Sequence, residues 1–130
     1  MGLKLITGPA SEPITLAEAK THLRITHSDD DTTITALIIA ARELCEQMTG
    51  RALLPQTWEK TLDAFPSNEI ELPHAPAVSI TSVKYIDISA VEITLASTEY
   101  TIDIDSEPGW LLLAVGKTWP ATADVANAVR

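Results

Sequence analysis

The chain has 130 residues, of which 45% are apolar, and this suits one globular domain with a single core. Its formal charge is −9, unevenly divided: residues 1–56 carry five Lys and Arg against seven Asp and Glu, and residues 57–130 carry four against eleven. This excess of negative charge excludes a protein that binds the phosphate backbone of DNA through clustered Lys and Arg, and it argues against binding to an anionic membrane.

The first predicted element is a short helix that begins after Thr15. Before it, residues 1–13 contain an apolar patch too short and too interrupted for a signal peptide or a membrane span, so we expect synthesis in the cytoplasm. Thr15 and Glu18 have the spacing of a capping box, in which each side chain accepts a hydrogen bond from the other residue's backbone. One narrow apolar stripe follows at Leu16, Ala19 and Leu23.

The second helix is predicted over residues 31–49, with Gly50 at the position of a left-handed C-cap. Its run 36–41, ALIIAA, is apolar on nearly all sides, and a helix with two apolar faces packs between two partners. Because so small a domain supplies one partner only, the second face is a candidate subunit contact, formed by Ala36, Ile39, Ala40 and Glu43. The residues expected to face the protein's own core are Ile34, Leu37, Ile38, Ala41, Leu44, Cys45 and Met48.

Three consecutive acids, Asp29, Asp30 and Asp31, precede this helix and raise the question of a metal site. A Ca²⁺ loop needs oxygen ligands at alternate positions, a glycine at the sharp turn and a late glutamate, whereas these acids are contiguous and Thr32 follows them. Negative charge at a helix N-terminus is stabilised by free N–H groups and by the helix dipole. We therefore interpret the cluster as a helix start.

From residue 55 onward, apolar and polar residues alternate and β-branched residues are in excess. This predicts short antiparallel strands, with a hairpin across Ser89 and Ala90. The last residues, VANAVR at 125–130, resemble the opening of one more strand. The predicted strands are 57–65, 69–72, 79–88, 91–95, 99–104 and 109–115.

The predicted fold class is α+β, with an N-terminal helical hairpin packed on a small antiparallel β-sheet or sandwich. We expect a single domain over residues 1–130, with a helical part at 1–54 and a β-rich part at 55–130.

No spacing typical of a metal or catalytic site is found, so we predict no cofactor, no metal and no catalytic residue. His22, His27 and His74 are not spaced as metal ligands. Cys45, the only cysteine, lies in the apolar stripe and is expected to pack as a small hydrophobe; without a second cysteine, a reducing compartment is indicated.

Two other patterns leave alternative functions open. Asp103, Asp105 and Glu107 fall on one face if their strand continues, as paired carboxylates of a glycoside hydrolase could. Trp58 and Trp110 fit positions in the core of a sheet, whereas Trp119 lies in a loop, either as a lid on the core or at an interface. A ligand-binding or carbohydrate-binding β module would use Trp110 or Trp119 as a platform.

Taken in order, several segments resemble the head–tail connector (adaptor) family of long-tailed double-stranded-DNA phages and prophages. The most specific are TLAEAK followed by a leucine, and TGRAL followed by QTW. The likeness covers nearly the whole chain, through PITLAEAKTHLRI (13–25), ITALIIAARELCEQMTGRAL (34–53), PQTWEKTLDAFP (55–66), ELPHAPAVSITSVKYID (71–87), YTID (100–103) and TWP (118–120).

The resemblance implies a structural protein at the head–tail junction of the virion, present in the host cytoplasm before assembly. Members form a ring of about twelve copies beneath the portal protein, extend the DNA exit channel and dock a stopper or tail completion protein. Isolated subunits can be monomers. Members also continue past a strand like VANAVR into a C-terminal helix, which we expect this chain to lack.

This resemblance agrees with the charge and with the second helix. DNA would pass an acidic surface without specific binding, because like charges repel, and Asp103, Asp105 and Glu107 are the predicted channel-facing residues. No membrane contact is expected.

Overall fold

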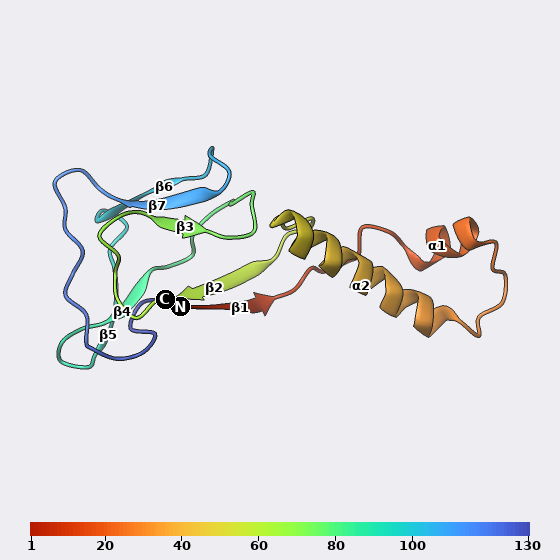
Figure 1. Cartoon of the computed structure of the whole chain (residues 1–130), viewed down its shortest axis with the longest axis horizontal. Helices are drawn as coiled ribbons and strands as arrows, with labels where there is room; N and C mark the ends of the chain where they lie inside the picture. Colours follow the sequence, from red (N-terminus) through yellow and green to blue (C-terminus); the bar gives the residue numbers. More distant parts are fainter.

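The computed structural model describes all 130 residues and shows an elongated molecule in which a helical arm projects from a β-rich body (Figure 1). The chain runs from strand β1 (Gly2–Thr7) into helices α1 (Leu16–Leu23) and α2 (Asp31–Thr49), and then returns to the body. The remaining strands are β2 (Thr57–Thr61), β3 (Ile70–Leu72), β4 (Lys84–Ile86), β5 (Glu92–Thr94), β6 (Tyr100–Asp103) and β7 (Gly109–Leu113).

Both predicted helices are confirmed, including the capping box of α1. The Thr15 backbone N–H donates to the Glu18 carboxylate at 2.8 Å, and the Glu18 N–H donates to Thr15 Oγ1 at 3.2 Å. Helix α2 ends at Gly50, which adopts a left-handed conformation with φ of 66°.

The helix α2 begins at Asp31, so the aspartate cluster is a helix start. Asp30 occupies the N-cap position, but its side chain makes no capping hydrogen bond. Asp31 instead accepts from Lys20 Nζ at 2.6 Å, which ties the start of α2 to α1. The cluster therefore acts through charge near the helix N-terminus and through one ion pair, not through a side-chain cap.

Strand β1 was not predicted, because residues 1–13 show only a broken apolar patch. It pairs antiparallel with β2, with Gly2 opposite Thr61 and Leu5 opposite Trp58. The chain leaves the body along β1 and re-enters it along β2, so this two-stranded ribbon is the root of the arm (Figure 1).

The C-terminal segment joins two parts of the body. Val129 pairs with Leu62, just beyond β2, and also with Tyr85 in β4, so residues 128–130 lie between these strands. Ala128 and Val129 are only 1% and 3% exposed. The predicted β character of residues 125–130 is thereby confirmed in part, and both chain termini lie close together beside β2 (Figure 1).

The body is built from short antiparallel pairings. β3, β7 and β6 form one three-stranded sheet, and β4 pairs with β5 through the predicted hairpin. In that turn Ala90 has a φ of 60°, and the Asp87 carboxylate accepts from the backbone N–H groups of Ser89 and Val91. The buried centre of the body comprises Ile70, Val83, Leu95 and Leu111.

The α+β class is confirmed, but the helices stand away from the sheets instead of covering one. Helix α2 packs against α1 and contacts no strand. The core stripe predicted for α2 is therefore wrong in most of its members. Of its residues only Ile34 is buried, whereas Leu37, Leu44 and Met48 are 61%, 56% and 78% exposed, and Cys45 is exposed as well.

Candidate functional site

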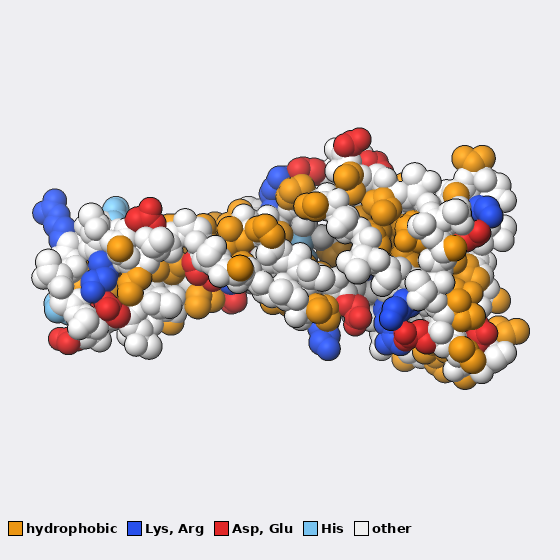
Figure 2. Space-filling view, turned by 180° about the vertical axis from the view of Figure 1, so that it is seen from behind, with side chains coloured by type: hydrophobic (Ala, Val, Ile, Leu, Met, Phe, Trp, Pro, Cys, Tyr) orange, Lys and Arg blue, Asp and Glu red, His pale blue; other side chains and the backbone are white.

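The long exposed side of α2 is the main apolar surface of the arm. We call it the outer ridge and define it by Leu37, Ala41, Leu44, Cys45 and Met48, all exposed. Their spacing of three and four residues places them on one side of the helix over about 16 Å of its length. Apolar side chains are also exposed elsewhere on the arm and on the body (Figure 2).

The exposed surface of the whole chain is larger than its mass requires. The molecule exposes 8711 Å², whereas a folded monomer of 14.0 kDa exposes about 6,700 Å². The excess of about 2,000 Å² follows from the projecting arm, whose two helices cover each other on one side only. Large hydrophobic side chains are among the exposed residues, and exposed apolar patches are typical of surfaces that partners cover.

The buried side of α2 carries a cluster of charged residues. Arg42 donates from Nε to Glu12 at 2.7 Å and from Nη1 to Glu46 at 2.6 Å, and its side chain is only 7% exposed. Glu46 also accepts from the backbone N–H of Leu53 at 2.9 Å. We call these three charged residues the Arg42 cluster. It joins α2 to the segment before α1 and to the segment after α2.

The hydrogen bond to Glu12, followed by that to Glu46, raises the pKa of Arg42 above its ordinary value, although burial opposes the rise. The guanidinium therefore stays charged. The cluster was missed in the sequence, although Arg42 and Glu46 stand four residues apart, a usual spacing for an ion pair on a helix.

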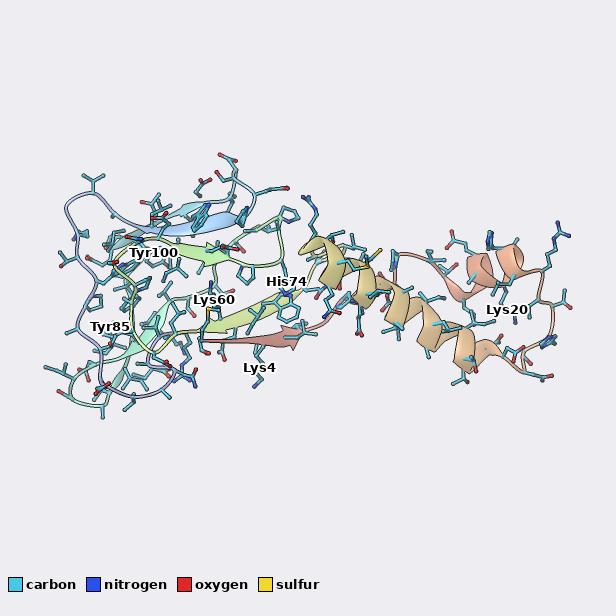
Figure 3. The ribbon with its side chains drawn as sticks, in the orientation of Figure 1. Lys4, Lys20, Lys60, His74, Tyr85 and Tyr100 are labelled. Carbon is cyan, nitrogen blue, oxygen red and sulfur yellow. The ribbon has the colours of Figure 1, made fainter.

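A second set of contacts joins the end of the arm to the body. Arg51 pairs with Glu107, and the Ala52 N–H donates to the Ala75 carbonyl at 2.9 Å. His74 lies at the end of the body that faces the arm (Figure 3), and its ring stacks on Trp58 with centroids 4.2 Å apart.

A shallow hollow lies on the arm itself, between α2 and the segment that leads into α1. Its volume is about 190 Å³, and we call it the arm hollow. It is lined by Ser11, Glu12, Ile14, Thr15, Leu16, Thr35 and Ile38.

The four predicted subunit-contact residues have different surroundings. Ala36, Ala40 and Glu43 are exposed, whereas Ile39 is already partly covered within the protomer. On α2 the exposed apolar surface is therefore larger than predicted and includes the outer ridge. The role of these four residues in subunit contact stays a prediction.

The three predicted channel acids do not share one face of a strand, because β6 ends at Asp103 and the chain turns there. The Asp103 carboxylate accepts from Ser106 Oγ at 2.7 Å and from the backbone N–H groups of Ser106 and Asp105 at 3.1 and 3.0 Å. These bonds, that of the Ser106 hydroxyl first, lower the pKa of Asp103. The Arg51 guanidinium lowers the pKa of Glu107 in the same way, and Asp105 is exposed without an ion pair.

The remaining titratable residues form no cluster of three or more His, Cys, Asp or Glu with metal-binding geometry. His27 lies 3.9 Å from Asp29 and 3.8 Å from Asp30, and all three side chains are more than half exposed. The expected burial of Cys45 is wrong, because the side of α2 that carries it faces solvent. No helix has the length and apolar character that crossing a membrane requires.

The tryptophans divide between core and surface. Trp119 stacks on Phe65 with centroids 4.7 Å apart and packs against the core of the body, so it is a lid on the core. The sequence placed Trp110 in the core of the sheet, but the core cluster does not include it. Trp110 lies half-buried on β7, between Glu71 and Asp103 of the neighbouring strands.

The model of the phage gp6-like head-tail connector protein family matches residues 13–105. A search of curated proteins found no match.

Two solved structures share the fold. One is a chain in the neck of an empty GTA particle computed with C6 symmetry: it is 22% identical, with a TM-score of 0.78, and the match covers 95% of this chain and 65% of that chain. The other is a chain in the virion of a native gene transfer agent (GTA) particle: it is 23% identical, with a TM-score of 0.74, and the match covers 99% and 69%. This chain thus spans less than two thirds of the first of these chains.

Proposed function

The chain belongs to the phage gp6-like head-tail connector family, and on this premise we propose that its copies form a ring between the portal protein and the stopper or tail completion protein. Membership makes it a structural protein of the head–tail junction in a phage or phage-like particle. In the proposed ring each subunit lengthens the DNA exit channel and offers a surface to the next protein of the neck.

The exposed outer ridge is the observation that carries the ring proposal. Leu37, Leu44 and Met48 are each more than half exposed in the protomer, and the body offers no surface that covers them. Burying one such side chain contributes about 1.5–3 kcal/mol, so covering several gives a neighbouring subunit a strong reason to bind. Ala36, Ala40 and Glu43 continue the contact beside the ridge, with Ile39 at its covered edge.

The charge of the body supports passage of DNA without specific binding. Residues 57–130 carry eleven acidic and four basic side chains, which repel phosphates. Within the predicted channel set, Glu107 is paired with Arg51 and Asp103 is bonded in its own turn, so Asp105 keeps the most accessible charge. We propose that this loop faces the channel.

We also propose that the protein is not an enzyme. A glycoside hydrolase needs one carboxyl whose pKa is raised so that it can act as a general acid. Hydrogen bonds and the Arg51 guanidinium shift the pKa of Asp103 and of Glu107 in the opposite direction. No observation favours the carbohydrate-binding alternative, because Trp119 is stacked in the body and Trp110 is half-covered.

The test replaces one residue of the ridge. Leu44→Asp places a charge on the outer ridge, and Ser97→Asp adds the same charge at an exposed polar position on the body, away from α2. Each variant is mixed with the portal protein encoded beside it, and the complex is imaged by negative-stain electron microscopy. The wild-type chain and Ser97→Asp should add an annulus to the portal. Leu44→Asp should lower the fraction of portals that carry the annulus at least about tenfold at equal protein concentration, since each 1.4 kcal/mol is a factor of ten in affinity.

Circular dichroism should show that Leu44→Asp keeps its helices, because Leu44 is more than half exposed within the protomer. An annulus that forms as readily with Leu44→Asp as with the wild-type chain would remove the ridge from the subunit contact. A wild-type chain that adds no annulus to the portal would refute the ring itself.

A further inference from the structure

The outer ridge and the arm hollow lie on different sides of α2. Successive residues turn by about 100° around an α-helix, so Leu37, Leu44 and Met48 point within about 40° of one another. Of the two α2 residues that line the hollow, Ile38 lies about 100° and Thr35 about 160° from Leu37 round the helix axis. The hollow therefore begins next to Cys45, at one edge of the ridge, and extends to the side of α2 opposite Leu44.

The two surfaces match in size and in chemistry. The arm hollow, of about 190 Å³, is lined in part by Ile14, Leu16 and Ile38. A cavity of about 150 Å³ lined by aliphatic side chains accepts a ligand the size of benzene, so one large side chain of the ridge fits. The only charged side chain that lines the hollow is that of Glu12, and Arg42 already pairs with it. A side chain that enters the hollow therefore does not remove an unpaired charge from water.

The exposed area also points to two contacts per subunit. A stable interface buries about 800 Å² on each partner, and the excess surface of this chain is about 2,000 Å². That excess accommodates two such contacts, one on each side of the arm. A subunit that uses two different surfaces joins its neighbours head to tail, and such contacts form a ring where the rotation between neighbours closes.

We propose that the outer ridge of one protomer enters the arm hollow of the next copy of this chain, with Leu44 as the central inserted side chain. This inference rests on the ring proposed above and specifies how neighbouring subunits meet. Ala36 and Ala40 flank the ridge, and their small side chains let the neighbouring arm approach closely. The rival arrangement is symmetric, with ridge against ridge, and would produce only pairs.

Cross-linking between engineered cysteines distinguishes the two arrangements. The natural thiol is first removed with Cys45→Ser, and three variants are made in that background: Thr35→Cys in the hollow, Leu44→Cys on the ridge, and both together. Thr35 and Leu44 are exposed, so all three variants should unfold at the same denaturant concentration as the Cys45→Ser chain under reducing conditions. Each is bound to its portal, treated with a short bis-maleimide and separated on a denaturing gel.

The double variant should give a ladder of dimers, trimers and higher products, because each subunit is linked to two neighbours. Within one chain the two thiols lie on different sides of the helix and cannot be bridged. Each single variant should remain at least about tenfold less cross-linked, because two ridges or two hollows do not meet in a head-to-tail ring.

Two results would overturn the inference. Strong dimer formation by Leu44→Cys alone would show that ridges meet each other symmetrically. The double variant could also yield only monomers on the gel although its complexes carry the added annulus. That result would place the subunit contact elsewhere and leave the proposed ring standing. Absence of the annulus with the wild-type chain would refute the ring, and this inference with it.

Discussion

At the scale of single residues, charged side chains hold the joint between arm and body. Glu107 comes from the β6–β7 loop and Arg51 from the segment just after α2, so their ion pair joins positions 56 residues apart in the sequence. Both side chains are nearly half exposed. Such a pair contributes little on its own, and its contribution depends on pH and on salt.

The pair predicts a specific loss of stability in acid. Arg51 lowers the pKa of Glu107 below its ordinary value of 4.5 in the folded chain. The contribution of Glu107 to the free energy of unfolding is therefore complete above about pH 4.5 and is lost as the pH falls through the folded pKa. Glu107→Gln should be less stable than the wild-type chain at pH 7 and should lose less stability on acidification. Urea unfolding at several pH values between 7 and 3 measures both.

Asp105→Asn is the control, since Asp105 lies in the same loop without an ion pair. High salt should reduce the difference between Glu107→Gln and the wild-type chain at pH 7, because salt screens exposed pairs. If Glu107→Gln and Asp105→Asn followed the same pH profile, the ion pair would contribute nothing to the joint.

Residues whose role is local could be predicted from the sequence. Thr15 and Glu18 interact within one helical turn, and their capping box was recognised from spacing alone. Arg51 and Glu107 could not be paired, because nothing local relates them. Asp103, Asp105 and Glu107 were predicted to share one face of a strand, because the sequence pattern does not reveal that β6 ends at Asp103.

At the scale of elements, the Arg42 cluster fixes α2 to the segments on either side of it. Arg42 is buried, and Glu12 and Glu46 both accept from its guanidinium. Removing one member of a buried ionic group leaves the others without partners and away from water, which is far more costly than losing an exposed pair. The cluster is therefore the main polar support of the arm.

Arg42→Met tests this, because it keeps most of the side-chain volume and removes the charge. We expect the free energy of unfolding at pH 7 to fall by about 3 kcal/mol, the lower end of the range for a broken buried pair, since Glu12 is partly exposed. Glu43→Gln is the matched control: Glu43 lies 3.6 Å from Arg42, its side chain is 64% exposed, and its replacement should change stability by less than about 0.5 kcal/mol. Equal stability of Arg42→Met and the wild-type chain would show that packing alone holds the arm.

The bounds of α2 were predicted correctly, but the side that faces the protein was not. Apolar spacing identifies a helix, and a cap fixes its ends, because both depend on neighbours in sequence. Which side is covered depends on what lies beside the helix. Here the buried residues of α2 are Ile34 and the charged Arg42 and Glu46, which pair with Glu12 before α1 and with Leu53 after α2, whereas the longest apolar stripe remains exposed. Hydrophobic pattern alone does not separate a core from a subunit contact.

At the scale of the whole molecule, the arm and the body are joined by few elements. The β1–β2 ribbon, the contacts of Arg51 and Ala52, and the Trp58–His74 stack make up the joint. Strand β1 was not predicted for two reasons. Its partner β2 lies about fifty or more residues away in the sequence. Most of its side chains are exposed, so it lacks the alternation of apolar and polar residues that marks a half-buried strand. The shape of the molecule depends on this unpredicted strand.

The extended shape can be checked in solution through the radius of gyration. A compact chain of 130 residues has a radius of gyration of about 14 Å. The exposed ridge would gain from burial against the body if the arm folded back, so an extended arm requires a joint that resists bending.

We expect small-angle X-ray scattering of Leu44→Asp, which should remain a monomer, to give a radius of gyration clearly above about 14 Å and a long tail in the distribution of interatomic distances. Adding Arg42→Met to this variant should broaden the tail, because α2 is then no longer fixed to the two segments that connect it with the rest of the chain. A radius near that of a compact chain would mean that the arm lies against the body in solution, with the ridge covered within the protomer and withdrawn from a neighbouring subunit.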